Sequence, residues 1–191
     1  MVIYLVRHGE DNNTVRGGWS SVPLTMKGRS QAKHLAESVY QDKLLISHIY
    51  SSDLPRAMQT AEPIAQRLGL PVIPVPQFRE VNNGELAGMD NAVAAQKYPG
   101  LYWNQLEWEQ HYPGGESPKA FYERVKAAWQ EFTEKQKESA LLVTHSGVIH
   151  IILSIVNRYP YSNQDKQPKV NHCELIAVEG DSCDAKVLRS L

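Results

Sequence analysis

Two segments far apart in the sequence each place a histidine and a glycine after an apolar run. Arg7-His8-Gly9 follows Val2 to Val6, and His145-Ser146-Gly147 follows Ala140 to Thr144. Histidine serves as a nucleophile near neutral pH, and the guanidinium fork of arginine matches the oxygens of a phosphate group. Glycine lets the backbone approach a ligand closely. The pattern predicts a phosphate site, against the alternative of a surface arginine and an ordinary half-buried histidine.

A sheet must bring these two histidines together. Both apolar runs are too short for helices and are rich in aliphatic residues, which indicates buried strands. Open α/β sheets place their ligands in a crevice at the carboxyl ends of parallel strands. We therefore expect His8 and His145 to meet at that edge.

Helical and strand patterns alternate along the rest of the chain. Helices are expected after Thr25, from Pro55 to Gly69, after Ser117 and from Val148 to Val156. Further strands are expected at Ile49–Ser51, Val72–Val75, Glu174–Val178 and Ala185–Leu191, the second of them near a sheet edge because of its prolines. The alternation predicts one α/β domain over residues 1–191, with a mostly parallel central sheet and helices on both faces in three layers, α/β/α.

Composition excludes several classes of function. The net charge of the 191 residues is −1 and no basic block stands out, which argues against a nucleic-acid partner. No apolar run approaches the roughly 18 residues of a membrane span, and no signal peptide precedes the first strand, so a cytoplasmic protein without membrane contact is expected. The two cysteines, Cys173 and Cys183, make neither a disulfide framework nor a four-cysteine zinc site.

Residues 78–116 form the least regular part of the chain. They are rich in aromatic residues, among them Trp103 and Trp108. A long irregular stretch in a compact domain is typical of a lid or binding loop, and this one is expected to be a lid or insertion over the site. The alternative is a small helical subdomain whose tryptophans form its own core.

A longer series of motifs accompanies the two histidines. The series runs Arg7-His8-Gly9-Glu10, Pro23-Leu24-Thr25, Ser51-Ser52-Asp53-Leu54, Arg56-Ala57, Phe78-Arg79-Glu80, Pro113-Gly114-Gly115-Glu116-Ser117 and Thr144-His145-Ser146-Gly147. In type and order these motifs resemble the histidine phosphatase superfamily, in its phosphoglycerate mutase-like branch. The resemblance covers the chain from Leu5 to about Val156 and implies a phosphoglycerate mutase-like fold.

The resemblance implies a catalytic role for each of five residues. His8 is the implied nucleophile, which forms a phosphohistidine, and Arg7 and Arg56 are implied to clamp the phosphate oxygens. His145 is implied to donate to a non-bridging oxygen, and Glu80 to exchange protons with the leaving group and the attacking water. No metal and no cofactor is expected, because the arginines and the histidine supply the positive charge.

The implied substrate contacts are less well matched to the family pattern. The family usually has an asparagine at the position of Thr14, so Thr14, Asn12 or Asn13 is left as the loop contact to phosphate. The substrate-binding residues that we expect are Arg7, Thr14, Gly18, Arg56, Ser146, Trp103 and Trp108. Glu85 is a second acid candidate but is expected to be a solvated loop residue. The other histidines, His34, His48, His111, His150 and His172, are expected on the surface or in the core.

Three functions compete at this point. The first is a metal-independent phosphatase that hydrolyses a small phosphomonoester through a phosphohistidine. The second is cofactor-dependent phosphoglycerate mutase-type phosphoryl transfer, although the chain lacks room for the extra stretch of the family's mutases. The third is a non-catalytic phosphate-binding module, which would be favoured by loss of site residues. The expected partner is the small-molecule substrate; its identity and the oligomeric state, a homodimer included, stay open.

Overall fold

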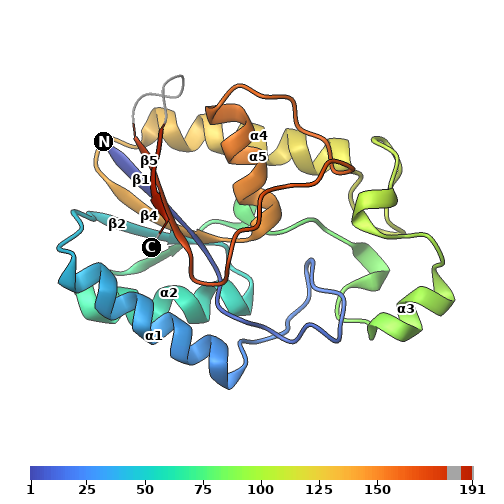
Figure 1. Ribbon diagram of the computed structural model, residues 1–191, viewed down its shortest axis with the longest axis horizontal. Helices are drawn as coiled ribbons and strands as arrows, with labels where there is room; N and C mark the ends of the chain where they lie inside the picture. Colours follow the sequence, from blue (N-terminus) through green and yellow to red (C-terminus); the bar gives the residue numbers. More distant parts are fainter. Residues whose placement is uncertain (180–185, 191) are drawn as a thin grey trace.

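A twisted sheet in the order β3-β2-β4-β1-β5-β6 runs through the centre of the molecule, as the computed structural model of residues 1–179 and 186–190 shows (Figure 1). Its strands are β1 (Val2–Arg7), β2 (His48–Ser51), β3 (Val72–Pro74), β4 (Ala140–Thr144), β5 (Leu175–Glu179) and β6 (Lys186–Ser190). All the predicted strands are present within one residue at each end. Ala185 and Leu191, which the prediction included in the last strand, lie outside the described residues.

The sheet is mostly parallel, as predicted. β3, β2, β4 and β1 pair in parallel, whereas β5 is antiparallel to β1 and β6 is antiparallel to β5. The proline-rich β3 lies at one edge. In the centre, Arg7 of β1 is in register with Thr144 of β4, and the His8 N–H donates to the Thr144 carbonyl at 2.9 Å. The two histidines therefore leave neighbouring strands at the same level.

Helices cover both faces of the sheet, which confirms the three-layer prediction (Figure 1). On one face, α1 (Met26–Gln41) and α2 (Pro55–Leu68) pack on Val6, Leu141 and Val143. On the other face, α4 (Pro118–Lys135) and α5 (Ser146–Val156) pack on Leu5 and Leu142. Side chains of one strand point alternately to opposite faces, so each central strand contributes to both cores.

The helix boundaries follow the capping residues. The Thr25 and Ser117 hydroxyls accept the N–H groups of Gly28 and Ala120, and Gly69 ends α2 in the left-handed conformation with φ of 69°. The prediction for α5 was wrong at its start, because the helix begins at Ser146 and not at Val148. Polar Ser146-Gly147 is compatible with a first helical turn, whose N–H groups have no intrahelical partner.

Residues 78–116 are more regular than predicted. They contain α3 (Asn91–Lys97) and the short 3-10 helices η2 (Gly84–Leu86) and η3 (Trp103–Gln105), and η1 (Pro76–Phe78) leads into them. Leu86, Leu106 and Tyr112 form a small core of their own. The Trp103 ring packs edge-on against Phe121 of α4, with 5.6 Å between ring centroids. The segment is therefore a packed insertion that Trp103 joins to the main domain. Within the described ranges, no helix has both the length and the apolar character needed to cross a membrane.

Candidate active site

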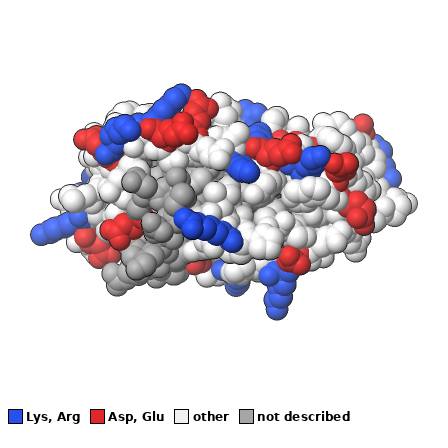
Figure 2. Space-filling model, turned by 90° about the horizontal axis from the view of Figure 1, so that it is seen from above, with Lys and Arg blue, Asp and Glu red and all other residues white. Residues whose placement is uncertain are grey.

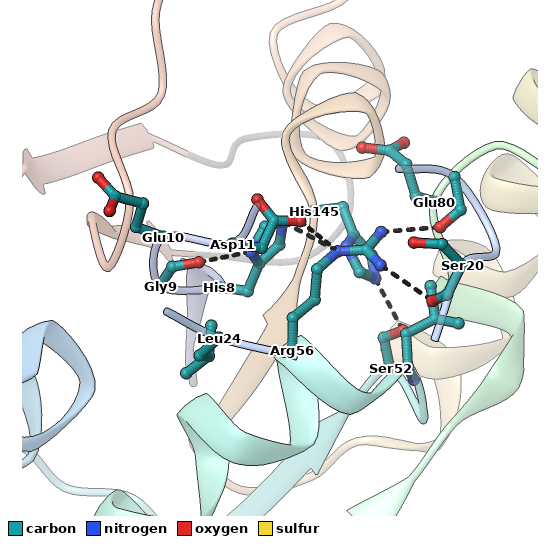
Figure 3. A network of polar contacts seen from close by, with 12 residues as sticks. His8, Gly9, Glu10, Asp11, Ser20, Leu24, Ser52, Arg56, Glu80 and His145 are labelled. Carbon is teal, nitrogen blue, oxygen red and sulfur yellow. Dashed lines mark hydrogen bonds and ion pairs between the residues drawn. The ribbon is translucent and has the colours of Figure 1, made fainter. Parts of the chain in front are cut away.

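His8 follows β1 directly and is held as a neutral ring. Its Nδ1 lies 2.7 Å from the Gly9 carbonyl oxygen, which only accepts hydrogen bonds, so Nδ1 carries the proton and Nε2 the lone pair. Nε2 lies 3.4 Å from the Nε of Arg56 (Figure 3). Burial, and next to it the charge of Arg56, lower the pKa of His8 well below its ordinary 6.5. His8 therefore presents an unprotonated nitrogen beside a guanidinium group.

Arg56 is buried, with 2% of its surface exposed, in the first turn of α2. Its Nη2 donates to the Gly18 carbonyl at 2.8 Å and its Nη1 to the Ser20 carbonyl at 3.4 Å, while the Asp11 carboxylate lies 3.4 Å from Nε. Gly18 has φ of +58°, and a Cβ there would lie 1.9 Å from the Asn83 side-chain oxygen. Only glycine fits this position. Gly18 acts here by fixing Arg56 through its carbonyl.

Arg7 and His145 leave unpaired nitrogens close to His8. Arg7 Nη1 donates to the Val170 carbonyl at 2.6 Å, whereas its buried Nε has no partner. His145 Nε2 lies 2.8 Å from the Ser52 hydroxyl, its buried Nδ1 has no partner, and its ring centroid lies 5.1 Å from that of His8. A buried polar group without a partner costs about 1–3 kcal/mol. A phosphate oxygen would satisfy such groups.

Glu80 reaches the same region from the loop after η1. Its two carboxylate oxygens accept the N–H groups of Val81 and of Gly147, each at 3.1 Å. A Cβ on Gly147 would lie 2.3 Å from the Glu80 carboxylate, so the glycine after His145-Ser146 makes room for Glu80. In Figure 3, Glu80 lies beyond His145 at the N-terminal end of α5.

Arg124 of α4 holds the segment that carries Glu80. Its guanidinium donates to the carbonyls of Gln77 at 2.7 Å, Arg79 at 3.1 Å and Glu80 at 3.0 Å. The Glu116 carboxylate accepts from the same guanidinium at 2.6 and 2.9 Å. A bidentate, charge-assisted pair of this kind is geometrically specific. Glu116 of the Pro-Gly-Gly-Glu-Ser motif thus acts on Glu80 through Arg124.

The phosphate contact expected of Thr14 stays a prediction, and the Thr14 hydroxyl has a partner within its own loop. Thr14 is exposed, and its hydroxyl donates to the Asn12 side chain at 2.9 Å. An isolated bridge between Val15 and Asp90 holds this turn against the insertion. Asn12 and Asn13 are also exposed. The carbonyls of Asn13 and Thr14 accept the side-chain and backbone N–H groups of Asn91, so the loop is bonded to the insertion.

Trp103 and Trp108 lie in different surroundings in the structure. Trp103 lines a cavity together with Glu80 and Ser146. Trp108 is 37% exposed, outside the lining of that cavity, and packs near Tyr122 and Tyr161. The substrate contact expected of Trp108 stays a prediction. The pairing with residues of α4 and of the loop after α5 was not visible in the sequence.

Glu85 is exposed and accepts a hydrogen bond from the Tyr98 hydroxyl, as expected of a solvated loop residue. Its carboxylate therefore belongs to the outer side of the insertion.

Three residues near the histidines were missed by sequence reasoning about the site. Asp11 balances Arg56, and Ser52 contacts His145. The His172 ring, expected on the surface or in the core, lies 5.8 Å from His8 between centroids. Ser52 and Asp11 stand within or beside the motifs, which was the available signal. His172 belongs to no motif, and only the antiparallel pairing of β5 with β1 brings it here.

The two buried histidines predict an acid-sensitive fold. Burial and Arg56 also lower the pKa of His145 well below 6.5, so both rings stay neutral when folded and gain protons when unfolded. The free energy of unfolding is therefore expected to fall as pH drops below about 6.5, by about 1.4 kcal/mol per pH unit and histidine, until the folded-state pKa is reached. Urea unfolding in phosphate-free buffers measures this slope.

A variant isolates the contribution of one ring. Between about pH 7 and about pH 5, the free energy of unfolding of His8→Gln is expected to fall less than that of the wild type. The two slopes are expected to differ by up to about 1.4 kcal/mol per pH unit, the contribution of one proton. His34→Gln, on the exposed side of α1, is the control and keeps the wild-type slope. Parallel curves for the wild type and His8→Gln would show that His8 does not titrate on unfolding.

Comparison with known proteins identifies the family. A model of the histidine phosphatase superfamily (branch 1) matches residues 3–190. Phosphoglycerate mutase-like protein 4 of Arabidopsis thaliana is 38% identical over 155 residues, 77% of this chain and 67% of the relative. Probable phosphoglycerate mutase GpmB of Salmonella choleraesuis is 32% identical over 183 residues, 93% of this chain and 84% of the relative. The solved alpha-ribazole phosphatase from Shigella flexneri superposes with a TM-score of 0.84 at 25% identity, over 100% of this chain and 96% of that one. The chain is therefore an enzyme of the histidine phosphatase superfamily, branch 1.

Proposed function

We propose that this enzyme is a metal-independent phosphatase that hydrolyses a small phosphomonoester through a phosphohistidine on His8. One observation carries the proposal: the unprotonated Nε2 of His8 lies 3.4 Å from Arg56, with unpaired buried nitrogens on Arg7 and His145 nearby. This arrangement offers a nucleophile and several donors to one tetrahedral anion.

In the first step, His8 Nε2 attacks phosphorus while the bond to the leaving oxygen breaks. Arg7 and Arg56 hold the non-bridging oxygens, and their fixed charges stabilise the charge that spreads over them. Glu80 gives its proton to the leaving oxygen, so the alcohol departs neutral. The Nδ1 proton of His8, held by the Gly9 carbonyl, keeps the ring in the reactive tautomer.

Ser52 orients His145 for its share of this work. In the tautomer that we propose, the Ser52 hydroxyl accepts from the Leu54 N–H at 3.4 Å and donates its own proton to His145 Nε2. Nδ1 of the neutral ring then carries a proton and becomes the donor to a phosphate oxygen. Ser52 is thus a positioning residue.

In the second step, water attacks the phosphohistidine and the phosphorus–nitrogen bond breaks. Glu80, now a carboxylate, takes the proton of the water, and inorganic phosphate and neutral His8 are left. The two N–H groups that bind the Glu80 carboxylate keep it in the same place for both steps.

The distribution of charge on one face of the molecule favours a small-molecule partner. Figure 2 shows acidic and basic side chains interspersed over the face seen from above. Among the described residues, no group of three or more histidine, cysteine, aspartate or glutamate side chains is arranged to hold a metal. The name of the Shigella relative, alpha-ribazole phosphatase, also favours hydrolysis.

The second candidate function is mutase-type transfer, in which the phosphohistidine returns its phosphoryl group to an organic acceptor. The names of the Arabidopsis and Salmonella relatives favour it. The chemistry at His8 is the same in both functions. They differ only in what attacks in the second step.

A panel of phosphomonoesters, assayed with EDTA, tests the proposal. We expect turnover to inorganic phosphate to be unchanged by EDTA, because Arg7, Arg56 and His145 supply the positive charge. Vanadate is expected to inhibit, since it adopts the five-coordinate geometry of the transferring phosphoryl group. Conversion of 3-phosphoglycerate to its 2-isomer faster than phosphate release would favour the mutase. Loss of activity in EDTA that Mg²⁺ restores would overturn metal independence.

A further inference from the structure

The loop between α5 and β5 forms one wall of a cavity beside Glu80. The cavity has a volume of about 400 Å³, and its lining includes Glu80, Trp103, His150 and Asp165. Asn163 of this loop donates to the carbonyls of Trp103 at 2.7 Å and Leu106 at 2.9 Å. The loop is thereby tied to the insertion, as the path of the segment after α5 in Figure 1 shows. The cavity therefore borders Glu80, the proposed acid, and Ser146, which follows His145.

Three polar side chains that face the cavity, Asn163, Gln167 and His150, are hydrogen-bonded to protein carbonyls. Both N–H bonds of Asn163 are used as described, and the Gln167 amide donates to the Ser162 carbonyl at 2.9 Å. His150 Nε2 lies 2.7 Å from the Pro168 carbonyl, so Nε2 carries the proton and Nδ1 is an acceptor. What these three residues have left to offer a ligand are acceptors and one N–H bond of Gln167. Ser146 and Asn104, also in the lining, both donate and accept.

The charge of the cavity points the same way. Asp165 is exposed at the cavity and makes no hydrogen bond or ion pair with the described residues. The lining has no lysine or arginine within the described part of the chain, and Lys166 and Lys169 of the same loop lie outside it. Apart from Glu80, the proposed acid, Asp165 is the carboxylate of the described lining that a leaving group meets.

We propose that this cavity is the leaving-group subsite for a neutral, hydroxyl-rich alcohol, a sugar or polyol, and that Asp165 determines this specificity. The inference rests on the proposed phosphatase function and names its substrate class. Hydroxyl groups donate to the acceptors of Asp165, Gln167 and Asn163, and the C–H face of the alcohol packs on the indole of Trp103. A carboxylate on the leaving group meets the like charge of Asp165 and no lysine or arginine of the described lining, so phosphoglycerate is a poor substrate.

Two substrates of the same carbon skeleton test the proposal. Glycerol 3-phosphate and 3-phosphoglycerate differ only in a terminal CH₂OH against a carboxylate. The wild type is expected to prefer glycerol 3-phosphate in kcat/KM by about tenfold or more, the scale of a single unfavourable charge and lost hydrogen bond. Asp165→Asn is expected to narrow this ratio about two- to fivefold, as for one exposed charge pair, and Asp165→Lys to narrow it further.

Controls separate this inference from the function on which it rests. Glu107→Gln removes an exposed carboxylate of the insertion outside the cavity lining and is expected to leave the ratio unchanged. p-Nitrophenyl phosphate, with no carboxylate and no hydroxyl, is expected to be hydrolysed equally by all variants.

Each further outcome decides between the two claims. If the wild type fails on p-nitrophenyl phosphate, the proposed function is overturned, and the subsite with it. If that ester is hydrolysed but both Asp165 variants keep the wild-type ratio, only the subsite is overturned. A wild type that prefers 3-phosphoglycerate also overturns it.

Discussion

Replacement of His8 by asparagine is expected to abolish turnover of every phosphomonoester, with a loss of roughly 10⁴-fold or more. Asparagine has no nitrogen that can form a covalent bond to phosphorus under these conditions, so both steps are lost together. Removal of a covalent nucleophile leaves only the catalysis supplied by binding groups such as Arg7 and Arg56. The loss should appear in kcat, since the phosphate donors stay in place.

Labelling followed by an alkaline denaturing quench gives a direct measurement, because phosphohistidine survives alkali and is lost in acid. Wild type mixed with a ³²P-labelled aryl phosphate is expected to carry a label that is stable to alkali and released by acid, whereas His8→Asn carries none. His34→Asn, exposed on α1, is the matched control and is expected to match the wild type. If His8→Asn still becomes labelled, the nucleophile lies elsewhere, and His145 and His172, whose rings lie 5.1 and 5.8 Å away, are the next to test.

Glu80→Gln is expected to slow the hydrolysis of alkyl phosphates by about 10²–10⁴-fold. An alkoxide is a poor leaving group and needs the proton of Glu80 in the first step. Nitrophenolate departs without a proton, so phosphohistidine still forms rapidly from p-nitrophenyl phosphate. The second step, in which Glu80 activates water, is then slow. Rapid mixing should show a burst of nitrophenol close to one per site before a slow steady rate.

The sequence supplies the control for this experiment. Glu85→Gln changes the other acid of the same segment, which is exposed and bonded to Tyr98, and is expected to have no effect on either ester. An equal loss on alkyl and aryl esters without a burst would remove Glu80 from the role of acid. Arg124→Lys loosens the segment that carries Glu80. This variant is expected to slow alkyl phosphates more than aryl phosphates, as Glu80→Gln does, but by a smaller factor.

Local pattern was sufficient for the frame of this protein. Short apolar runs such as Ala140–Thr144 form strands that are buried in the sheet. Thr25 and Ser117 start helices because their hydroxyls accept backbone N–H groups of the first turn. His8 and His145 were expected together because parallel strands end at one edge, and their strands are adjacent. Arg7, Arg56 and Glu80 were placed by motif, and the structure brings them to the same region.

Contacts between distant segments decided the rest. The sequence around Thr14 does not indicate the bridge between Val15 and Asp90 that connects this loop to the insertion. Nor does the sequence around Gly147 indicate that this glycine makes room for the Glu80 carboxylate.

By itself, then, the sequence determined the family, the fold class and the five residues proposed for catalysis, because these depend on local periodicity and on short motifs. Only the tertiary structure decided how the loops contact one another around the site. It separated Trp103 from Trp108, brought His172 to His8, and placed Asp165 at the cavity beside Glu80. Such placements depend on packing and hydrogen bonds across tens of residues, as between Asn163 and Trp103, and no local pattern records them.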